Sequence, residues 1–161
     1  MVNEGLQILE AAVAEGNHPG YYANYMCRLI SEMHSTLGSI EYELNLPGHG
    51  RSCFEKAHAQ RSKLLEEEGT SVEAYDVETM ALMKSNISLT YLSDRSAARS
   101  IESFHHLLND FANPNLKSVC AANLSLAYQI DGNVEESLRW CQRSFDLTRE
   151  VYGEDSLSMA R

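Results

Sequence analysis

One recurring spacing constrains the fold of this 161-residue chain more than any other feature of its sequence. A small residue is followed four positions later by a larger one, and three positions after that by a residue that is mostly small. The spacing occurs four times, at Gly5, Leu9 and Ala12; at Gly50, Phe54 and Ala57; at Ser100, Phe104 and Leu107; and at Ser137, Cys141 and Ser144. Positions i, i+4 and i+7 share one face of a helix, where the small residue admits a second helix and the larger one fills the groove between them. The sequence therefore predicts one packing unit that is repeated along the chain.

A second pattern precedes the first at a fixed distance. An apolar residue stands beside a small one at Leu37-Gly38, Ile87-Ser88 and Leu124-Ser125. In all three cases the small residue lies sixteen positions before the larger residue of the following segment, which is Phe54, Phe104 or Cys141. A constant separation predicts antiparallel helix pairs that cross closely at Gly38, Ser88 and Ser125. We expect the side chains of Phe54, Phe104 and Tyr128 to be largely buried in such pairs.

Apolar residues recur at helical spacing between clusters of Gly, Pro, Asn and Asp, and strand-like alternation is absent. The segment from Tyr21 to Leu44 has this period most clearly, with apolar residues at steps of three and four. Seven helices are predicted, and an eighth is expected to begin at the end of the chain. Their predicted ranges are 3–15, 20–45, 51–68, 72–93, 96–112, 115–131 and 134–152.

One segment carries a family resemblance. Residues 123–137 read NLSLAYQIDGNVEES, which is similar to the Asn-Leu-Ala-x-x-Tyr-x-x-x-Gly-x-x-x-Glu-Ala core of the tetratricopeptide repeat in its kinesin-light-chain-like form. Residues 149–156, REVYGEDS, and residues 15–19, EGNHP, resemble the turn between repeats of that family. Two positions depart from the family pattern, because Glu41 stands where Tyr is preferred and Asp94-Arg95 replaces the usual Gly turn.

The resemblance implies an all-α fold, a right-handed superhelix of antiparallel helix pairs that forms a solenoid. We expect one repeat domain over residues 1–161, with a partial unit at 1–16, full units at 19–69, 71–113 and 115–153, and the start of another unit at 155–161. Because the chain opens on a second helix and closes on a first helix, we expect it to be a fragment of a longer array.

Charge and cysteine content narrow the function classes. The 13 basic and 23 acidic residues give a net charge of -10, which repels nucleic acid and anionic membranes. No apolar run is long enough to span a membrane, and the N-terminus lacks the basic leader of a secretory signal. The four cysteines are scattered without a CxxC pair, so we expect reduced thiols and a cytoplasmic protein.

The resemblance further implies a protein-interaction module in which the first helix of each pair lines a concave, peptide-binding surface. Asn86 and Asn123 stand where the family's asparagine contacts the ligand backbone, and an amide offers both a donor and an acceptor. Placed by register, the predicted binding residues are Asn86, Asn123, Leu82, Ser85, Leu89, Leu92, Val119, Ala122, Leu126, Gln129, Ile130, Glu32, Ser39, Tyr42 and Glu43. Glu32 and Glu43 have no predicted counter-charge, which favours a ligand with basic residues. The alternative is that the apolar members pack helix on helix and that the asparagines bond a neighbouring helix.

Catalytic, metal and cofactor sites are not predicted. His49, Cys53 and His58 are of metal-ligand type but lack a fourth ligand, and the adjacent His105 and His106 diverge around a helix as a solvent-facing pair. Residues 48–52, GHGRS, lack the Gly-Lys-Ser/Thr ending of a phosphate-binding loop. We therefore predict that the chain is not an enzyme. The alternative functions are a structural spacer, a homo-oligomerisation or regulatory domain of a larger signalling protein that associates through exposed solenoid ends, and a helical enzyme domain.

Overall fold

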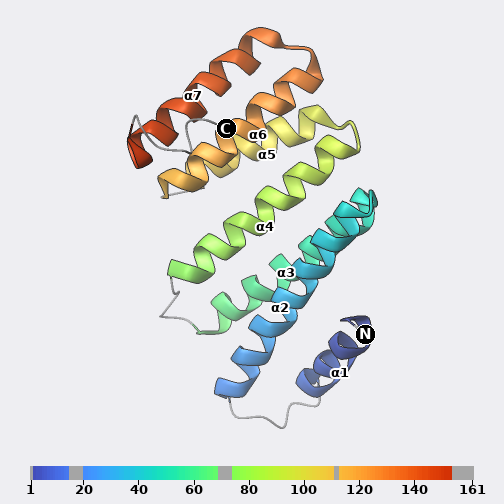
Figure 1. Cartoon of the computed structure of the whole chain (residues 1–161). Helices are drawn as coiled ribbons and strands as arrows, with labels where there is room; N and C mark the ends of the chain where they lie inside the picture. The colour runs from blue at the N-terminus through green and yellow to red at the C-terminus, as the bar shows by residue number, and fades with distance from the viewer. Residues whose placement is uncertain (1, 15–19, 69–73, 111–112, 154–161) are drawn as a thin grey trace. The chain divides into compact units, whose positions relative to one another are not determined.

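A computed structural model describes residues 2–14, 20–68, 74–110 and 113–153 (Figure 1). These residues form helices and contain no strand, which confirms the all-α prediction. The helices are α1 (Val2–Ala14), α2 (Gly20–Glu43), α3 (Pro47–Glu68), α4 (Ala74–Ser93), α5 (Ala97–Asp110), α6 (Pro114–Asp131) and α7 (Val134–Tyr152). The turn expected at residues 15–19 and the helix expected from residue 155 lie outside the described residues.

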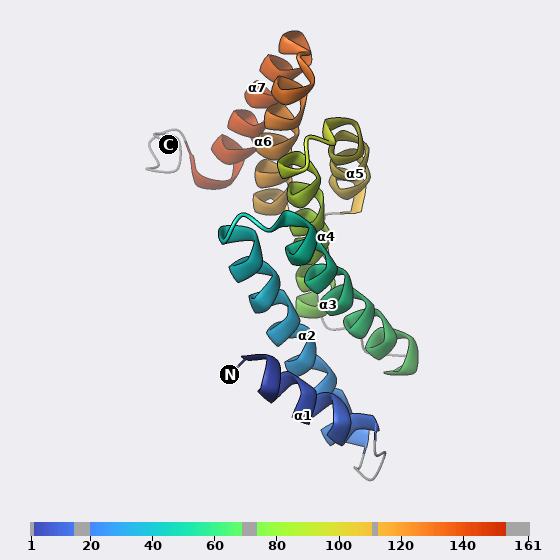
Figure 2. The same ribbon diagram turned by 90° about the vertical axis from the view of Figure 1, so that its right-hand side faces the viewer.

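The chain forms two compact units, Met1–Ile87 and Ser88–Arg161. In the first unit α1 packs on α2 and α2 packs on α3; in the second unit α5 packs on α6 and α6 packs on α7. Figure 2 shows α1 beside α2 and α6 beside α7 from a second direction. Helix α4 begins in the first unit and ends in the second.

Three short turns have the same backbone geometry. Asn45, Arg95 and Gly132 each follow the end of a helix with a positive φ, of 61°, 57° and 85° respectively. The amide of each residue, and that of the next residue, donates to carbonyl oxygens of the last helical turn, as in the bonds from Arg95 to Leu92 O and from Ser96 to Tyr91 O. This is the Schellman motif, which satisfies the carbonyl groups that a helix end leaves without partners. The motif reverses the chain within three residues, so the two helices of each pair run antiparallel.

Helix α3 begins at Pro47, four residues before the predicted start at residue 51. The prediction treated the residues from Pro47 to Gly50 as a break, but proline at the first helical position loses no hydrogen bond because its amide would have no partner there. Gly50 is therefore helical, and the other helix boundaries lie within two residues of those predicted.

The predicted close crossings are confirmed in three helix pairs. A Cβ atom built on Gly38 would lie 2.9 Å from the ring of Phe54 and 3.0 Å from the carbonyl oxygen of Gly50. The other two crossings use serine: Ser100 Oγ donates to the carbonyl of Ser88 at 2.9 Å, and Ser125 Oγ donates to the carbonyl of Ser137 at 2.8 Å. Each crossing joins residues twelve positions apart, so the repeated spacing reflects one packing geometry.

The residues predicted to fill the helix crossings differ in their exposure to solvent. Phe54 and Phe104 are buried as predicted. Tyr128 is only half-buried, because its hydroxyl bonds His105 at the edge of the core. Cys141 is exposed and does not fill a groove, since no helix among the described residues covers that side of α7. The prediction for Cys141 is therefore wrong, whereas the partial burial of Tyr128 agrees with the prediction that most of its side chain is covered.

Candidate functional site

Helix α6 has two apolar faces. Asn113 caps its start by accepting a bond from the amide of Asn115 at 2.9 Å, and Pro114 is the first helical residue. One face is buried and contains Cys120, Ala121, Leu124 and Ala127. The opposite face is open to solvent, and its apolar members Val119, Leu126 and Ile130 are 52%, 45% and 46% exposed. An apolar face that remains open opposite a buried one is a surface available for binding.

This open face of α6 carries no charge. From Asn115 to Ile130 every exposed residue of the helix is uncharged, although the whole chain has a net charge of -10. The exposed residues are Asn115, Val119, Ala122, Leu126, Gln129 and Ile130. We call this set the α6 face. Its composition suits an apolar or mixed ligand better than a strongly charged one, because a charge placed there would lose hydration without gaining a counter-charge.

Asn123 lies half-buried at the edge of the α6 face. Within the described residues its side-chain amide forms no hydrogen bond, and the same holds for Asn86 on α4. A bond to a neighbouring helix was the structural alternative for these two asparagines, and the described residues provide none. On α4, Leu82 is 46% exposed, while Asn86 and Leu89 are half-buried.

Two of the binding positions predicted on α4 are buried. Ser85 and Leu92 are each 6% exposed, so a peptide on the surface would not reach them, and the prediction is wrong for both. They share a buried stripe with Ala81 and Ser88, at helical steps of four, three and four. Leu82 and Leu89 each follow a residue of this stripe by one position, so they lie on the neighbouring side of the helix.

The residues predicted on α2 also require a correction. Glu32, Ser39 and Glu43 are exposed and Tyr42 is half-buried. Ser39 Oγ donates to the carbonyl of its own helix one turn earlier. Glu32 was expected to lack a counter-charge, but its Oε1 lies 3.7 Å from Nη2 of Arg61. The sequence does not indicate this pairing, because Arg61 belongs to a different helix and is fully buried.

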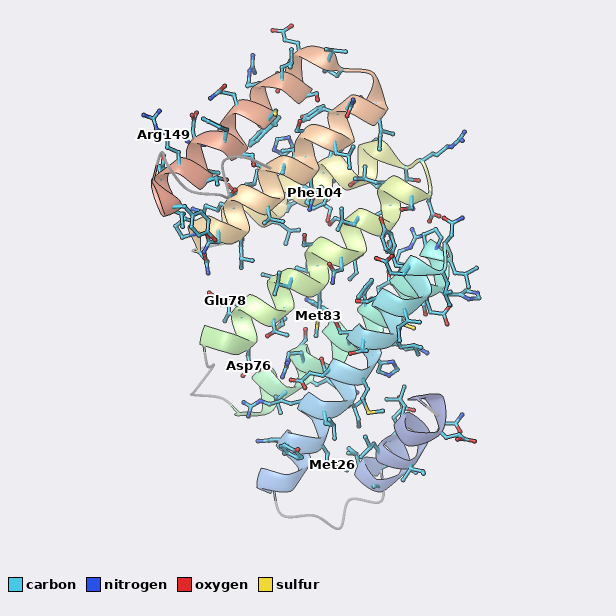
Figure 3. All side chains as sticks on the ribbon, viewed as in Figure 1. Met26, Asp76, Glu78, Met83, Phe104 and Arg149 are labelled. Atoms are coloured by element: carbon cyan, nitrogen blue, oxygen red, sulfur yellow. The ribbon has the colours of Figure 1, made fainter. Side chains whose placement is uncertain are left out.

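Arg61 belongs to a charged cluster inside the first unit. Its Nη1 lies 3.1 Å from Oδ1 of Asp76, and the other oxygen of Asp76 accepts a bond from Arg28 Nη2 at 3.1 Å. Asp76 lies in the first turn of α4, where Figure 3 labels it. The cluster joins α2, α3 and α4 with two positive and two negative groups, Glu32 included. Its charges balance internally, so it has no excess charge to attract a ligand.

The histidine pair proposed from the sequence is divided by the fold. His106 is exposed, but His105 is half-buried and bonds the hydroxyl of Tyr128 at 2.9 Å through Nε2. The rings of His105 and Trp140 meet edge to face with centroids 5.2 Å apart. Burial, with the nearby Glu136 and Asp131, raises the pKa of Tyr128. The prediction of a solvent-facing pair is therefore wrong for His105, which contributes to packing among α5, α6 and α7.

Other sites of chemical interest are few in the described part of the chain. No group of three or more His, Cys, Asp or Glu residues is placed there to hold a metal ion. Burial and the neighbouring Lys84 lower the pKa of His58, and burial raises the pKa of Cys53. No described helix is both long enough and apolar enough to cross a bilayer.

The chain is similar to known proteins in two respects. Residues 119–158 match the tetratricopeptide repeat, a span that contains every residue of the α6 face except Asn115. Among solved structures, the chain is similar to the N-terminal domain of stress-induced protein-1 (STI-1) from C. elegans, with 15% identity over 83% of this chain and 91% of that one, and a TM-score of 0.49. No curated protein matches the chain in sequence.

Proposed function

This chain carries a tetratricopeptide repeat at residues 119–158, and from that premise we propose that it is a protein-interaction module whose α6 face binds an extended segment of a partner polypeptide. The observation that carries the proposal is the exposure of Val119, Leu126 and Ile130 on an uncharged face opposite the buried side of the same helix. Burying this face against a ligand would release apolar surface from water.

The α6 face also limits the size of the ligand. From Asn115 to Ile130 the helix rises about 22 Å at 1.5 Å per residue. An extended chain advances about 3.3 Å per residue, so about seven ligand residues would lie along the face. Apolar ligand side chains would contact Val119, Leu126 and Ile130, while the Asn123 amide would bond the ligand backbone.

The first unit offers similar chemistry on a smaller scale. Leu82 is exposed on α4 beside the half-buried Asn86, whose amide has no hydrogen bond within the described residues. On α2, Glu43 is exposed and forms no ion pair within the described residues, whereas Glu32 is paired with Arg61. We therefore assign the preference for a basic ligand residue to Glu43 alone.

A peptide-display experiment tests the proposal. A library of random twelve-residue peptides is selected on the immobilised chain, and enriched peptides are titrated against Asn123→Ala, Leu126→Ala and the matched control Asn109→Ala. Asn109 is an exposed asparagine on α5 that bonds the carbonyl of its own helix. A ligand backbone group left without a partner costs about 1–3 kcal/mol, so Asn123→Ala should weaken binding about 5- to 150-fold.

The control distinguishes a binding role from a structural one. Asn109→Ala should leave affinity unchanged, and both asparagine variants should keep the circular dichroism and melting temperature of the parent chain. Equal affinity of Asn123→Ala and the parent for every enriched peptide would place binding elsewhere. A lower melting temperature for Asn123→Ala alone would show that this asparagine is structural.

Self-association is the second candidate function, and a separate observation favours it. Helix α7 carries its own exposed apolar residues, which include Leu138 at 66% and Val134 at 64%. These residues do not belong to the α6 face, so the two proposals can fail independently.

A further inference from the structure

Helix α7 exposes an apolar stripe that runs from Val134 to Phe145 and includes Tyr152 two turns further on. The stripe consists of Val134, Leu138, Cys141, Phe145 and Tyr152, all exposed, at steps of four, three, four and seven. Steps of this kind place the five side chains on one face of the helix. The side that packs in the second unit is different and includes the buried Leu147. We call the five residues the α7 stripe.

Charged and polar residues border the α7 stripe in a definite order. From the N-terminal end they are negative Glu135, positive Arg139, neutral Gln142, negative Asp146 and positive Arg149. Three of their contacts are local to the helix: Arg139 lies 2.6 Å from Glu136 and 3.9 Å from Glu135, and Gln142 donates to Asp146 at 3.0 Å. Exposed contacts of this kind contribute little and rearrange readily.

The order of these charges is complementary to itself when it is read in reverse. If a second copy of α7 lies antiparallel, Glu135 faces Arg149 of the other copy, Arg139 faces Asp146, and Gln142 faces Gln142. In an antiparallel pair, the sum of the two residue numbers is nearly the same for every facing pair. The sums for these three pairs agree to within one. A parallel pair would instead place each charge against its like.

The same antiparallel register aligns the apolar residues. Leu138 lies opposite Phe145 of the second copy, Val134 lies opposite Tyr152, and the two Cys141 side chains lie near the two-fold axis. Apolar and charged residues thus agree on one alignment to within about two residues. A two-fold interface requires a surface that is complementary to itself, and a second copy of the chain meets this requirement. We propose that two copies of this chain associate through their α7 stripes, antiparallel around a two-fold axis near Cys141.

The size of the stripe sets the expected strength of the dimer. Five side chains from each copy would bury on the order of 1,000 Å² in total, at the lower end of specific interfaces. The dimer should therefore dissociate on dilution. The proposal is independent of peptide binding, because the α6 face and the α7 stripe share no residue.

Sedimentation velocity over a range of concentrations of the 161-residue chain tests the proposal. The parent chain should shift from monomer to dimer as its concentration rises. Leu138→Asp should raise the dimer dissociation constant at least tenfold, because it places a charge among apolar side chains. Asn123→Ala should leave the dimer unchanged. Circular dichroism of each variant verifies folding, which should persist because Leu138 is exposed and the Asn123 amide forms no hydrogen bond within the described residues.

A charge reversal tests the register itself. Arg139→Glu places a negative charge opposite Asp146 of the other copy, and the two-fold axis repeats this repulsion. The dimer dissociation constant should rise about 3- to 30-fold. The double variant Arg139→Glu with Asp146→Arg restores opposite charges across the interface and should recover the parent dissociation constant. Loss without recovery would overturn the antiparallel register.

Thiol chemistry provides an independent readout. Mild oxidation at dimer-forming concentrations should link two chains through Cys141, and Cys141→Ser should abolish the linked species. A chain that is monomeric at every concentration would overturn the proposal. If Cys141 in that monomer were also protected from oxidation, another part of the same chain would cover the α7 stripe. A dimer insensitive to Leu138→Asp would overturn it equally, because association would then use another surface.

Discussion

Arg61 and Asp76 form an ion pair in which neither side chain is exposed to solvent, with 3.1 Å between Nη1 and Oδ1. The contact is an ion pair whose geometry falls outside that of a hydrogen bond. The second oxygen of Asp76 accepts a bond from Arg28. One carboxylate in the first turn of α4 therefore contacts two guanidinium groups, one on α3 and one on α2.

Removing the charge of Asp76 should destabilise the fold. Asp76→Asn preserves the side-chain size but leaves Arg61 buried opposite a neutral group. Loss of one partner from a buried ion pair costs about 3–5 kcal/mol, and we expect the free energy of unfolding to fall by this amount in urea titrations. Glu55→Gln is the matched control, since Glu55 is an exposed carboxylate on α3. The control should change stability by less than about 0.5 kcal/mol. Similar urea midpoints for the two variants would show that the pair does not stabilise the unit.

The sequence does not reveal the pair of Arg61 and Asp76. Its members belong to two helices, and no local pattern marks a charged residue that will be fully buried. The small residues at helix crossings are predictable because the twelve-residue separation of Gly38 and Gly50 recurs in Ser88 and Ser100. Patterns of short range and fixed spacing are therefore visible in the sequence, whereas pairings between helices depend on the finished packing.

The close crossing at Gly38 predicts that alanine substitutions at Gly38 and Gly48 have different effects on the melting temperature. A Cβ on Gly38 would meet the Phe54 ring at 2.9 Å and the Gly50 carbonyl at 3.0 Å, and neither group can move freely. Overpacking costs about 1–3 kcal/mol, which exceeds the gain of about 1 kcal/mol from alanine in a helix. Gly38→Ala should therefore lower the melting temperature. Gly48→Ala in α3 should raise it slightly or leave it unchanged, because a Cβ there has nothing within 4 Å. Equal shifts for both variants would contradict a tight crossing.

The exposed apolar face was predictable on α6 but only partly on α4. On α6 the buried and open faces lie on opposite sides, so the register separates them cleanly. Helix α4 is more enclosed, with Met83 and Thr90 buried on one side and Ser85 and Leu92 buried on another. Only a narrow strip with Leu82 remains open, and a register taken from one helix cannot account for burial on two sides. The exposure of Cys141 was not predicted, because the prediction expected a neighbouring helix to cover that side of α7.

The turn at Arg95 is strained and should respond to glycine. Arg95 has a φ of 57°, a left-handed conformation that costs residues with a Cβ about 1–2 kcal/mol. Glycine adopts it without this cost but gains freedom in the unfolded chain, so Arg95→Gly should stabilise the protein by about 0.5–1 kcal/mol. The melting temperature should rise by about 1–4 °C. Arg95→Ala retains the Cβ and removes the same exposed charge, so it should not stabilise. Identical melting curves for the Gly and Ala variants would show that the backbone is not strained.

Cys120 should resist alkylation in the folded protein. It is buried, its Sγ donates to the carbonyl of Phe104 at 3.3 Å, and burial raises its pKa to about 12. The thiolate is the reactive form, and at pH 8 a thiol with that pKa is ionised in only about one molecule in ten thousand. Because the pKa of the Cys120 thiol in the folded protein lies above its usual value of 9.0, the folded state holds this proton more tightly. The contribution of the protonated Cys120 thiol to the free energy of unfolding is complete below about pH 9 and is lost as pH rises through 12.

Iodoacetamide at pH 8, followed by peptide mass spectrometry, should modify the exposed Cys141 and spare Cys120. The measurement is made in dilute protein, and a sample in concentrated guanidinium chloride, where all four cysteines react, serves as the control. Equal native rates for Cys120 and Cys141 would show that α6 opens on the timescale of labelling and that its buried face is not a stable core.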